Sequence, residues 1–293
     1  MQTKQERERA FHNEAYTDLR RRRVWGFYDV TSASHDRFRE LLAAESPAGK
    51  EVLEFGCGLT TQAMSLASQG ARVTGIDISD VAVEQARASA DEYGVTERTH
   101  FVRMDGESLE FADDSFDLVC GSAILHHLDL AKVYTQISRV LRPGGAGVFI
   151  EPLGHNPAIN LFRDRTPNLR TPDEHPLVEG DFDLASEYFG QVDLSFFHLA
   201  GLLAIPLRKR SAFPKVLSAL DAADRRLFKL VPAVRKHGWM VVLRLAPSLS
   251  TSRETASPRW INEPEGENWS TGMLDSSKLE TDPEVARRVP QEP

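Results

Sequence analysis

The chain has little cysteine, no long apolar run and no large excess of charge. Its two cysteines, Cys57 and Cys120, argue against a disulfide framework and for a reducing compartment. No stretch is apolar over the length of a membrane-spanning helix, and the charged segment 1–9 lacks the apolar core of a secretion signal. The net charge of −8 provides no general attraction to nucleic acid. These absences predict a cytoplasmic protein that has no nucleic-acid partner.

A glycine-containing turn behind a short apolar run carries the first functional signal. Residues 52–55 predict a strand, and the apolar positions that begin at Ala63 predict a helix directly after it. The glycines between them, Gly56 and Gly58, allow backbone N–H groups at the positive end of the helix dipole to approach a ligand. A dinucleotide fingerprint requires a third glycine where Thr61 stands, so a phosphate-binding interpretation fits poorly.

Four further apolar stretches alternate with helical patterns. They cover residues 72–77, 101–103, 116–122 and 146–150. This alternation predicts an α/β fold whose parallel sheet has helices on both faces. Ligands in such sheets bind beyond the carboxyl ends of the strands, so the polar residues that follow the strands should lie together. Those residues are Glu54, Asp77, Asp105, His126 and Glu151.

These segments together resemble class I S-adenosylmethionine-dependent methyltransferases of the type 11 or UbiE-like group. The matching features are the acid and alternating glycines of residues 54–58, the strand-end acid Asp77, the segment 123–128 and the turn 141–145. The resemblance implies a seven-stranded Rossmann-like sheet, mostly parallel with an antiparallel last strand, and helices on both faces. It covers the central part of the chain, where five elements occur in the family's order.

The resemblance also implies S-adenosyl-L-methionine as the cofactor. By analogy Glu54 helps to hold the ammonium group, Asp105 accepts from the adenine amine, and Asp77 is spaced to accept both ribose hydroxyls. Cofactor contacts are therefore expected from Glu54, Gly56, Cys57, Gly58, Asp77, Ile78, Met104, Asp105 and Ser122.

The remaining segments predict how the chain is divided. We expect an N-terminal helical cap over residues 1–48, a cofactor-binding core over 49–151, and an acceptor-site region with the last two strands over 152–246. Residues 247–293 are polar and without periodicity, which predicts a disordered tail. Aromatic side chains of the cap either form a wall of the pocket or pack in the core; they are Phe11, His12, Trp25 and Tyr28.

The segment 199–237, between the last two predicted strands, is unusually basic. It has nine basic and two acidic residues within an acidic protein, and its apolar positions predict two amphipathic helices broken by prolines. One interpretation is a lid that contacts an apolar, anionic acceptor or a membrane surface. The other is a pair of helices that pack on the sheet with a solvated basic face.

Catalysis by such a protein needs orientation more than a catalytic triad. A sulfonium group is already an activated methyl donor, and orientation alone can lower the barrier by roughly 7–11 kcal/mol. A positioned base would add to this, and imidazole titrates near neutrality. His127 and His155 are the first candidates and His126 is the third. The histidines and acids lack the close sequence pairing of a zinc site, so no metal is expected.

The leading hypothesis is methyl transfer to an oxygen of a small-molecule acceptor, either a natural product or a lipid-like compound. Nitrogen or carbon methylation remains open. A second hypothesis is a protein that binds the cofactor without methyl transfer, because Thr60 stands where the family often has a further glycine. A third, a nicotinamide-dependent oxidoreductase, is disfavoured by Thr61.

Overall fold

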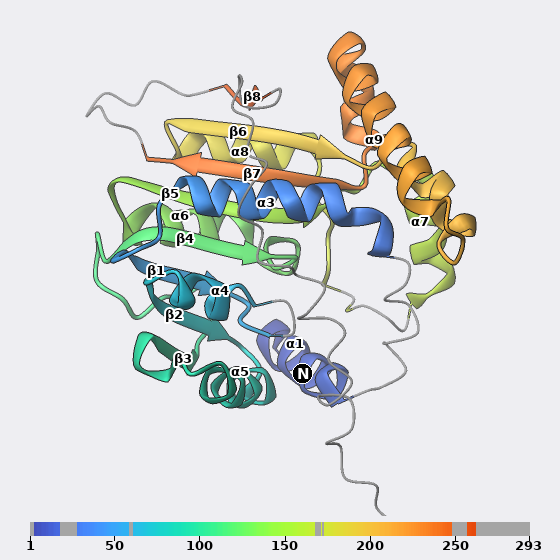
Figure 1. Cartoon of the computed structure of the whole chain (residues 1–293). Helices are drawn as coiled ribbons and strands as arrows, with labels where there is room; N and C mark the ends of the chain where they lie inside the picture. Colours follow the sequence, from blue (N-terminus) through green and yellow to red (C-terminus); the bar gives the residue numbers. More distant parts are fainter. Residues whose placement is uncertain are drawn as a thin grey trace, which may run out of the picture. The chain divides into compact units, whose positions relative to one another are not determined.

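The computed structural model of the protein describes residues 3–17, 28–58, 61–167, 171, 173–247 and 257–261. Eight strands form one sheet. They are β1 (Glu51–Phe55), β2 (Arg72–Asp77), β3 (Thr99–Arg103), β4 (Phe116–Ser122), β5 (Leu141–Pro152), β6 (Gln191–Phe197), β7 (Met240–Ala246) and β8 (Arg259–Trp260). Their spatial order is β3-β2-β1-β4-β5-β7-β6-β8 (Figure 1).

The sheet is mostly parallel. β1 pairs in parallel with β2 and β4, and the parallel pairing continues outward to β3 on one side and β5 on the other. β7 runs antiparallel to both β5 and β6. The strand order reverses between β1 and β4, and a crevice for a ligand forms at the carboxyl ends of strands where such a reversal occurs. The predicted α/β class and the antiparallel last strand are confirmed.

The eighth strand departs from the sequence-based expectation. We expected seven strands and no ordered structure after residue 247, whereas Arg259–Trp260 pairs in parallel with β6. A cation–π contact helps to hold this short strand, because the guanidinium of Arg235 lies 3.6 Å from the centroid of the Trp260 indole ring. The remainder of the predicted tail lies outside the described residues.

Helices cover both faces of the sheet and enclose two apolar cores (Figure 1). One layer contains α3 (Ser32–Ala44), α4 (Ala63–Ser68) and α5 (Asp80–Tyr93), and the opposite layer contains α6 (Leu130–Val140) and α8 (Glu179–Tyr188). Successive residues of a strand point to opposite faces, so Val52 joins the first core and Leu53 the second. Both side chains are fully buried, as expected for an inner parallel strand.

The first helix, α1 (Lys4–Thr17), lies beyond the carboxyl ends of β1 and β2, next to α5 (Figure 1). The predicted N-terminal helices correspond to α1 and α3. Trp25 and the basic run at 20–23, which the sequence places between them, lie outside the described residues. The short 3-10 helix η2 (Tyr28–Thr31) leads into α3.

The segment 199–237 does not form two amphipathic helices. It forms one, α9 (Phe213–Leu230), flanked by the 3-10 helices η6 (Gly201–Leu207) and η7 (Pro232–His237). Pro206 lies inside η6 and cannot donate a backbone hydrogen bond there, which limits a regular α-helix over that stretch. Among the described helices, which also include α7 (Pro157–Arg165), we find none with both the length and the apolarity needed to cross a membrane.

Candidate functional site

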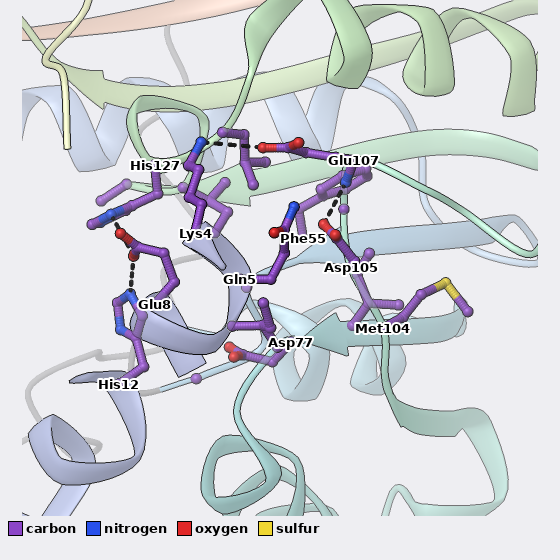
Figure 2. A pocket seen from close by; sticks show the side chains of 18 of the residues that line it. Lys4, Gln5, Glu8, His12, Phe55, Asp77, Met104, Asp105, Glu107 and His127 are labelled. Atoms are coloured by element: carbon purple, nitrogen blue, oxygen red, sulfur yellow. Dashed lines mark hydrogen bonds and ion pairs between the residues drawn. The ribbon is translucent and has the colours of Figure 1, made fainter. Parts of the chain in front are cut away.

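A cavity of about 260 Å³ opens at the carboxyl ends of β1 to β4. The sheet side of its wall comes from the residues that follow these four strands, and the other side comes from α1 (Figure 2). Lys4, Gln5, Glu8 and His12 line it, and their spacing places them on one face of α1. The cavity therefore lies at the reversal of strand order, between a rigid sheet edge and a helix from the start of the chain.

The turn after β1 brings bare backbone to the cavity. Gly56 has a φ of +70°, and its N–H donates to the Ile76 carbonyl at 2.8 Å. A Cβ at this position would lie 3.3 Å from the Ile124 side chain, so a larger residue would be strained in its backbone conformation and crowded by Ile124. Gly56 and Gly58, which we expect to contact the cofactor, line the cavity. Cys57 does not: its side chain is fully buried, and burial raises the pKa of its thiol well above the ordinary value.

Glu54 lies beneath this turn and is not among the residues that line the cavity. Its carboxylate accepts from the Thr61 hydroxyl at 2.6 Å and from the backbone N–H groups of Gln62 and Ala63, the latter at 3.2 Å. It therefore fixes the loop and the first turn of α4. Burial raises the pKa of Glu54 to about 7, although these donors favour the charged form.

The end of β2 supplies a carboxylate that does face the cavity. Asp77 lines it together with Ile78, and the Asp77 side chain is buried. One carboxylate oxygen accepts from the Ser79 N–H at 2.8 Å. The Ser79 hydroxyl caps α5 by accepting from Ala82 N–H and donates to the Asn13 side chain of α1 at 2.6 Å. Through Ser79, these hydrogen bonds link α5 and α1 to Asp77, the carboxylate that is expected to bind the ribose.

The residues after β3 link the sheet to α1. Met104 and Asp105, which we expect to contact the cofactor, line the cavity, and the Asp105 carboxylate accepts from the Glu107 N–H at 2.9 Å. Glu107 in turn accepts from the ammonium group of Lys4 at 3.2 Å (Figure 2). It also accepts from the ammonium group of Lys132 at 3.0 Å. Sequence reasoning missed Glu107 and Lys4, because the two lie 103 positions apart.

The segment after β4 is held from below by a buried acid. Glu151 at the end of β5 is fully buried and accepts from the N–H groups of Ile124 and Leu125, each at 2.9 Å. Its second oxygen contacts His126 Nδ1 at 2.7 Å. Ser122, predicted to contact the cofactor, and Ile124 both line the cavity. Glu151 therefore sets the path of the chain from β4 into the 3-10 helix η4 (Leu125–His127).

This anchoring separates the two adjacent histidines. His126 is buried against Glu151 and does not line the cavity, whereas His127 does. Burial and the proximity of His127 lower the pKa of His126 against the opposing effect of Glu151. A neutral, hydrogen-bonded His126 is suited to support the segment, and His127 is the predicted catalytic histidine that reaches the cavity.

His127 is part of a cluster with two residues of α1. Oε2 of Glu8 lies 3.3 Å from His12 Nε2 and 3.3 Å from His127 Nδ1, so the carboxylate lies between the two rings (Figure 2). Burial alone would raise the pKa of Glu8, but its contacts with His12, His127 and Thr171 outweigh burial and hold the pKa well below its usual range. The cavity thus has a buried carboxylate anion beside two imidazoles.

The predicted catalytic residue His155 lies elsewhere. His155 is not among the residues that line the cavity. Its carbonyl accepts from His237 Nδ1 at 2.9 Å, and the two rings pack at 6.4 Å. Of the described residues in the predicted acceptor-site region 152–246, none lines the cavity. This segment supports the site from outside: His175 N–H donates to the His126 carbonyl at 2.8 Å.

The cavity residues that sequence reasoning missed include three from α1, namely Lys4, Gln5 and Glu8. Residues at positions i and i+4 of a helix share one face, so the spacing of Glu8 and His12 is a weak signal that they act together. Their contact with His127 depends on how α1 packs against the sheet edge, and the local sequence pattern does not encode that packing. His12 itself had been predicted as a possible wall residue, and it does line the cavity.

The sequence is similar to known methyltransferase domains and to related proteins. Residues 52–145 match the family model described as a methyltransferase domain. The chain is 38% identical over 128 residues to 27-O-demethylrifamycin SV methyltransferase of Amycolatopsis mediterranei, a match that covers 41% of this chain and 47% of that protein. It is 37% identical over 111 residues to the S-adenosyl-L-methionine-dependent Diels-Alderase iccD of Talaromyces variabilis, covering 36% of this chain and 37% of that one.

A solved structure supports the fold. Haemonchus contortus phosphoethanolamine N-methyltransferase 2, in complex with phosphomonomethylethanolamine and S-adenosylhomocysteine, superposes with a TM-score of 0.53 at 18% identity. The match covers 73% of this chain and 53% of that one. At this identity the likeness concerns the fold alone. The chain spans less than half the length of the two relatives above.

Proposed function

We propose that this chain, whose residues 52–145 form a class I S-adenosylmethionine-dependent methyltransferase domain, transfers a methyl group from S-adenosyl-L-methionine to an oxygen atom of a small molecule. The observation that carries the proposal is the cavity itself. Strand-end carboxylates line its sheet side, and on the other side Glu8 and His12 of α1 meet His127 of η4. The two walls fit two ligands of different chemistry.

The sheet side suits the cofactor. Asp77 offers a buried carboxylate to the ribose hydroxyls, and Asp105 lies beyond the next strand, where it can accept from the adenine amine. Gly56 and Gly58 let backbone approach the amino-acid end. Glu54 contributes through the loop that it holds, and its negative charge when ionised favours the cationic cofactor. The sulfonium supplies the activated methyl group.

The α1 side suits the acceptor. Methylation of a hydroxyl removes its proton, so an oxygen acceptor needs a group that polarises or deprotonates it. Among the predicted catalytic histidines only His127 lines the cavity, and Glu8 lies beside its Nδ1. The relative from Amycolatopsis, whose name denotes methylation of a hydroxyl on a natural product, supports an oxygen acceptor of that chemical kind.

A second candidate function has one specific observation in its favour. The similar protein iccD is named as a cofactor-dependent Diels-Alderase. A cavity enclosed between a rigid sheet and α1 could equally shape a reactive substrate without methyl transfer. This alternative predicts a bound cofactor that is not consumed.

One experiment separates the two functions. The full chain is incubated with S-adenosyl-L-methionine carrying a labelled methyl group and a panel of phenolic, quinone, sugar and lipid acceptors. We expect label in an acceptor and stoichiometric S-adenosylhomocysteine, and much less of both from an Asp77→Asn variant at limiting cofactor. Cofactor binding, seen as a raised melting temperature, without labelled product from any acceptor would favour the second function.

We also propose that the segment 199–237 contacts anionic lipid, which would bring lipid-like acceptors to the protein. Support comes from two leucines that remain largely solvent-exposed, Leu203 at 71% and Leu230 at 79%. Basic residues of α9 lie on the same stretch of chain as Leu230, among them Arg226 and Lys229. Apolar and cationic side chains together are the combination that binds membrane surfaces.

A further inference from the structure

Glu8, His12 and His127 present their ligand atoms to one another at the cavity wall. The carboxylate oxygen and the two ring nitrogens all lie within 4.8 Å of one another. Both rings approach the same oxygen, Glu8 Oε2, at 3.3 Å. Two of the residues come from one face of α1 and the third from η4, so three side chains converge from two elements (Figure 2).

The contacts within this cluster are close, yet key atoms lack hydrogen-bond geometry. Glu8 is 5% exposed, and neither of its carboxylate oxygens has a hydrogen-bond partner within the described part of the chain. The same holds for His127 Nδ1 and for Oγ1 of the buried Thr171, which interacts with Glu8. Unpaired buried polar atoms are costly, so several at one point indicate a missing ligand.

We propose that Glu8, His12 and His127 bind a divalent transition-metal ion. Metal–nitrogen and metal–oxygen bonds of about 2.0–2.2 Å in tetrahedral geometry place neighbouring ligand atoms roughly 3.3–3.5 Å apart. Both measured separations from Oε2 are 3.3 Å. In such an arrangement each ring nitrogen points at the ion and not at the neighbouring oxygen. This explains why His127 Nδ1 contacts the carboxylate without a hydrogen bond.

The ligand set determines the class of metal. Two imidazoles and one carboxylate are typical of zinc and related first-row ions, whereas magnesium and calcium prefer oxygen ligands alone. Three protein ligands leave the fourth position open, which is the pattern of catalytic sites. The adjacent His126 does not compete for the ion through Nδ1, because that atom is already bonded to Glu151 at 2.7 Å.

The ion gives the site a way to activate an oxygen acceptor, and this step rests on the proposed function. A hydroxyl bound at the open position becomes more acidic and loses its proton to solvent. The resulting oxygen anion attacks the methyl carbon, the carbon–sulfur bond breaks, and its electron pair returns to sulfur to give S-adenosylhomocysteine. The acceptors that fit are alcohols, phenols and enols, and His127 then serves as a metal ligand.

Metal binding can be tested without cofactor or acceptor. The full chain is stripped with a chelator, dialysed and titrated with Zn²⁺ against a chromophoric chelator, and separately with Co²⁺ while the visible spectrum is recorded. We expect one Zn²⁺ per chain and intense cobalt bands typical of four-coordination. His12→Ala, a half-buried position on α1, should weaken Zn²⁺ binding at least 100-fold, as should Glu8→Gln.

A matched control is His100→Ala, because His100 is exposed on β3 and outside the cluster. It should bind Zn²⁺ like the wild type. Absence of stoichiometric binding by the wild type, or unchanged affinity in His12→Ala, overturns the proposal. Circular dichroism confirms that each variant is folded. One bound Zn²⁺ in a protein that transfers no methyl group to any acceptor supports the metal site while contradicting the proposed function, so the two can fail separately.

Discussion

Arg7 on α1 forms a two-point ion pair with Asp173, 166 positions later in the chain. Arg7 Nε lies 3.0 Å from Oδ2 and Nη2 lies 2.9 Å from Oδ1 of the carboxylate. Together with the contacts from Lys4 to Glu107 and from Asn13 to Ser79, this pair fixes α1 against three separate segments. These polar contacts therefore help to hold the α1 side of the cavity in place.

We predict that Arg7→Gln weakens cofactor binding about 2- to 5-fold with little change in global stability. The pair is partly exposed, with side-chain exposures of 40% and 22%, and such pairs contribute roughly 0.2–1 kcal/mol. Titration calorimetry with S-adenosylhomocysteine measures the effect. Arg39→Gln removes an exposed ion pair on α3 and should leave the affinity unchanged. Equal affinities for Arg7→Gln and wild type would show that α1 does not influence the cofactor.

Asp77→Asn should raise the dissociation constant for S-adenosylhomocysteine about 10- to 100-fold. The substitution preserves shape but removes a buried charged acceptor, and hydrogen bonds to charged groups contribute roughly 1.5–3 kcal/mol. The control is Asp113→Asn, at an acid that is 73% exposed and distant from the lining residues. An unchanged constant in Asp77→Asn would remove this carboxylate from the cofactor site.

Glu54 should make the free protein less stable as the pH rises from about 4.5 to about 7. Its pKa is about 7 in the folded chain against an ordinary 4.5, so in this range the folded state holds a proton that the unfolded state has lost. Stability falls with pH wherever the folded state binds more protons, here by on the order of 3 kcal/mol in total. Urea unfolding at several pH values measures the slope.

The Glu54→Gln variant tests this assignment, because it cannot titrate while it keeps an acceptor for Thr61 and the loop. Its stability should vary less between pH 5 and pH 7.5 than that of the wild type. A variant with the same slope as the wild type would assign the titration to other groups. Glu110→Gln, at an exposed acid, serves as the charge-matched control.

Binding of the segment 199–237 to lipid predicts sedimentation with anionic vesicles at low salt and release at high salt, since the attraction is electrostatic. Leu230→Asp should reduce the bound fraction several-fold, because it replaces an apolar side chain that is 79% exposed. Neutral vesicles should bind little protein. Failure to sediment with anionic vesicles even at low salt contradicts the membrane proposal.

The sequence was sufficient for the sheet because its strands are short apolar runs with turn residues behind them. Residues 51–55 and 72–77 form the strands that their composition predicts, and Asp77 and Asp105 reach the cavity because parallel strands end at one edge. β8 escaped prediction because two residues carry no periodicity. It forms because β6 offers a free edge and Arg235 packs on Trp260.

The details of the site depended on contacts that local pattern cannot encode. His126 and His127 are equivalent in sequence, and only the bonds of Glu151 to residues 124–126 decide which of them faces the cavity. The expectation of no metal site rested on sequence spacing alone. Sequence spacing cannot show that α1 brings Glu8 and His12 beside His127.

The origin of the two cavity walls has a consequence for how this protein can change over time. The wall assigned to the nucleoside comes from strand ends embedded in the core, where substitutions also disturb folding. The opposite wall is formed largely by one helix, which ion pairs and a hydrogen bond join to the remainder of the chain. Mutations in that helix can change which molecules enter the cavity while the residues proposed to bind the cofactor stay the same. New substrates can therefore evolve without rebuilding the domain.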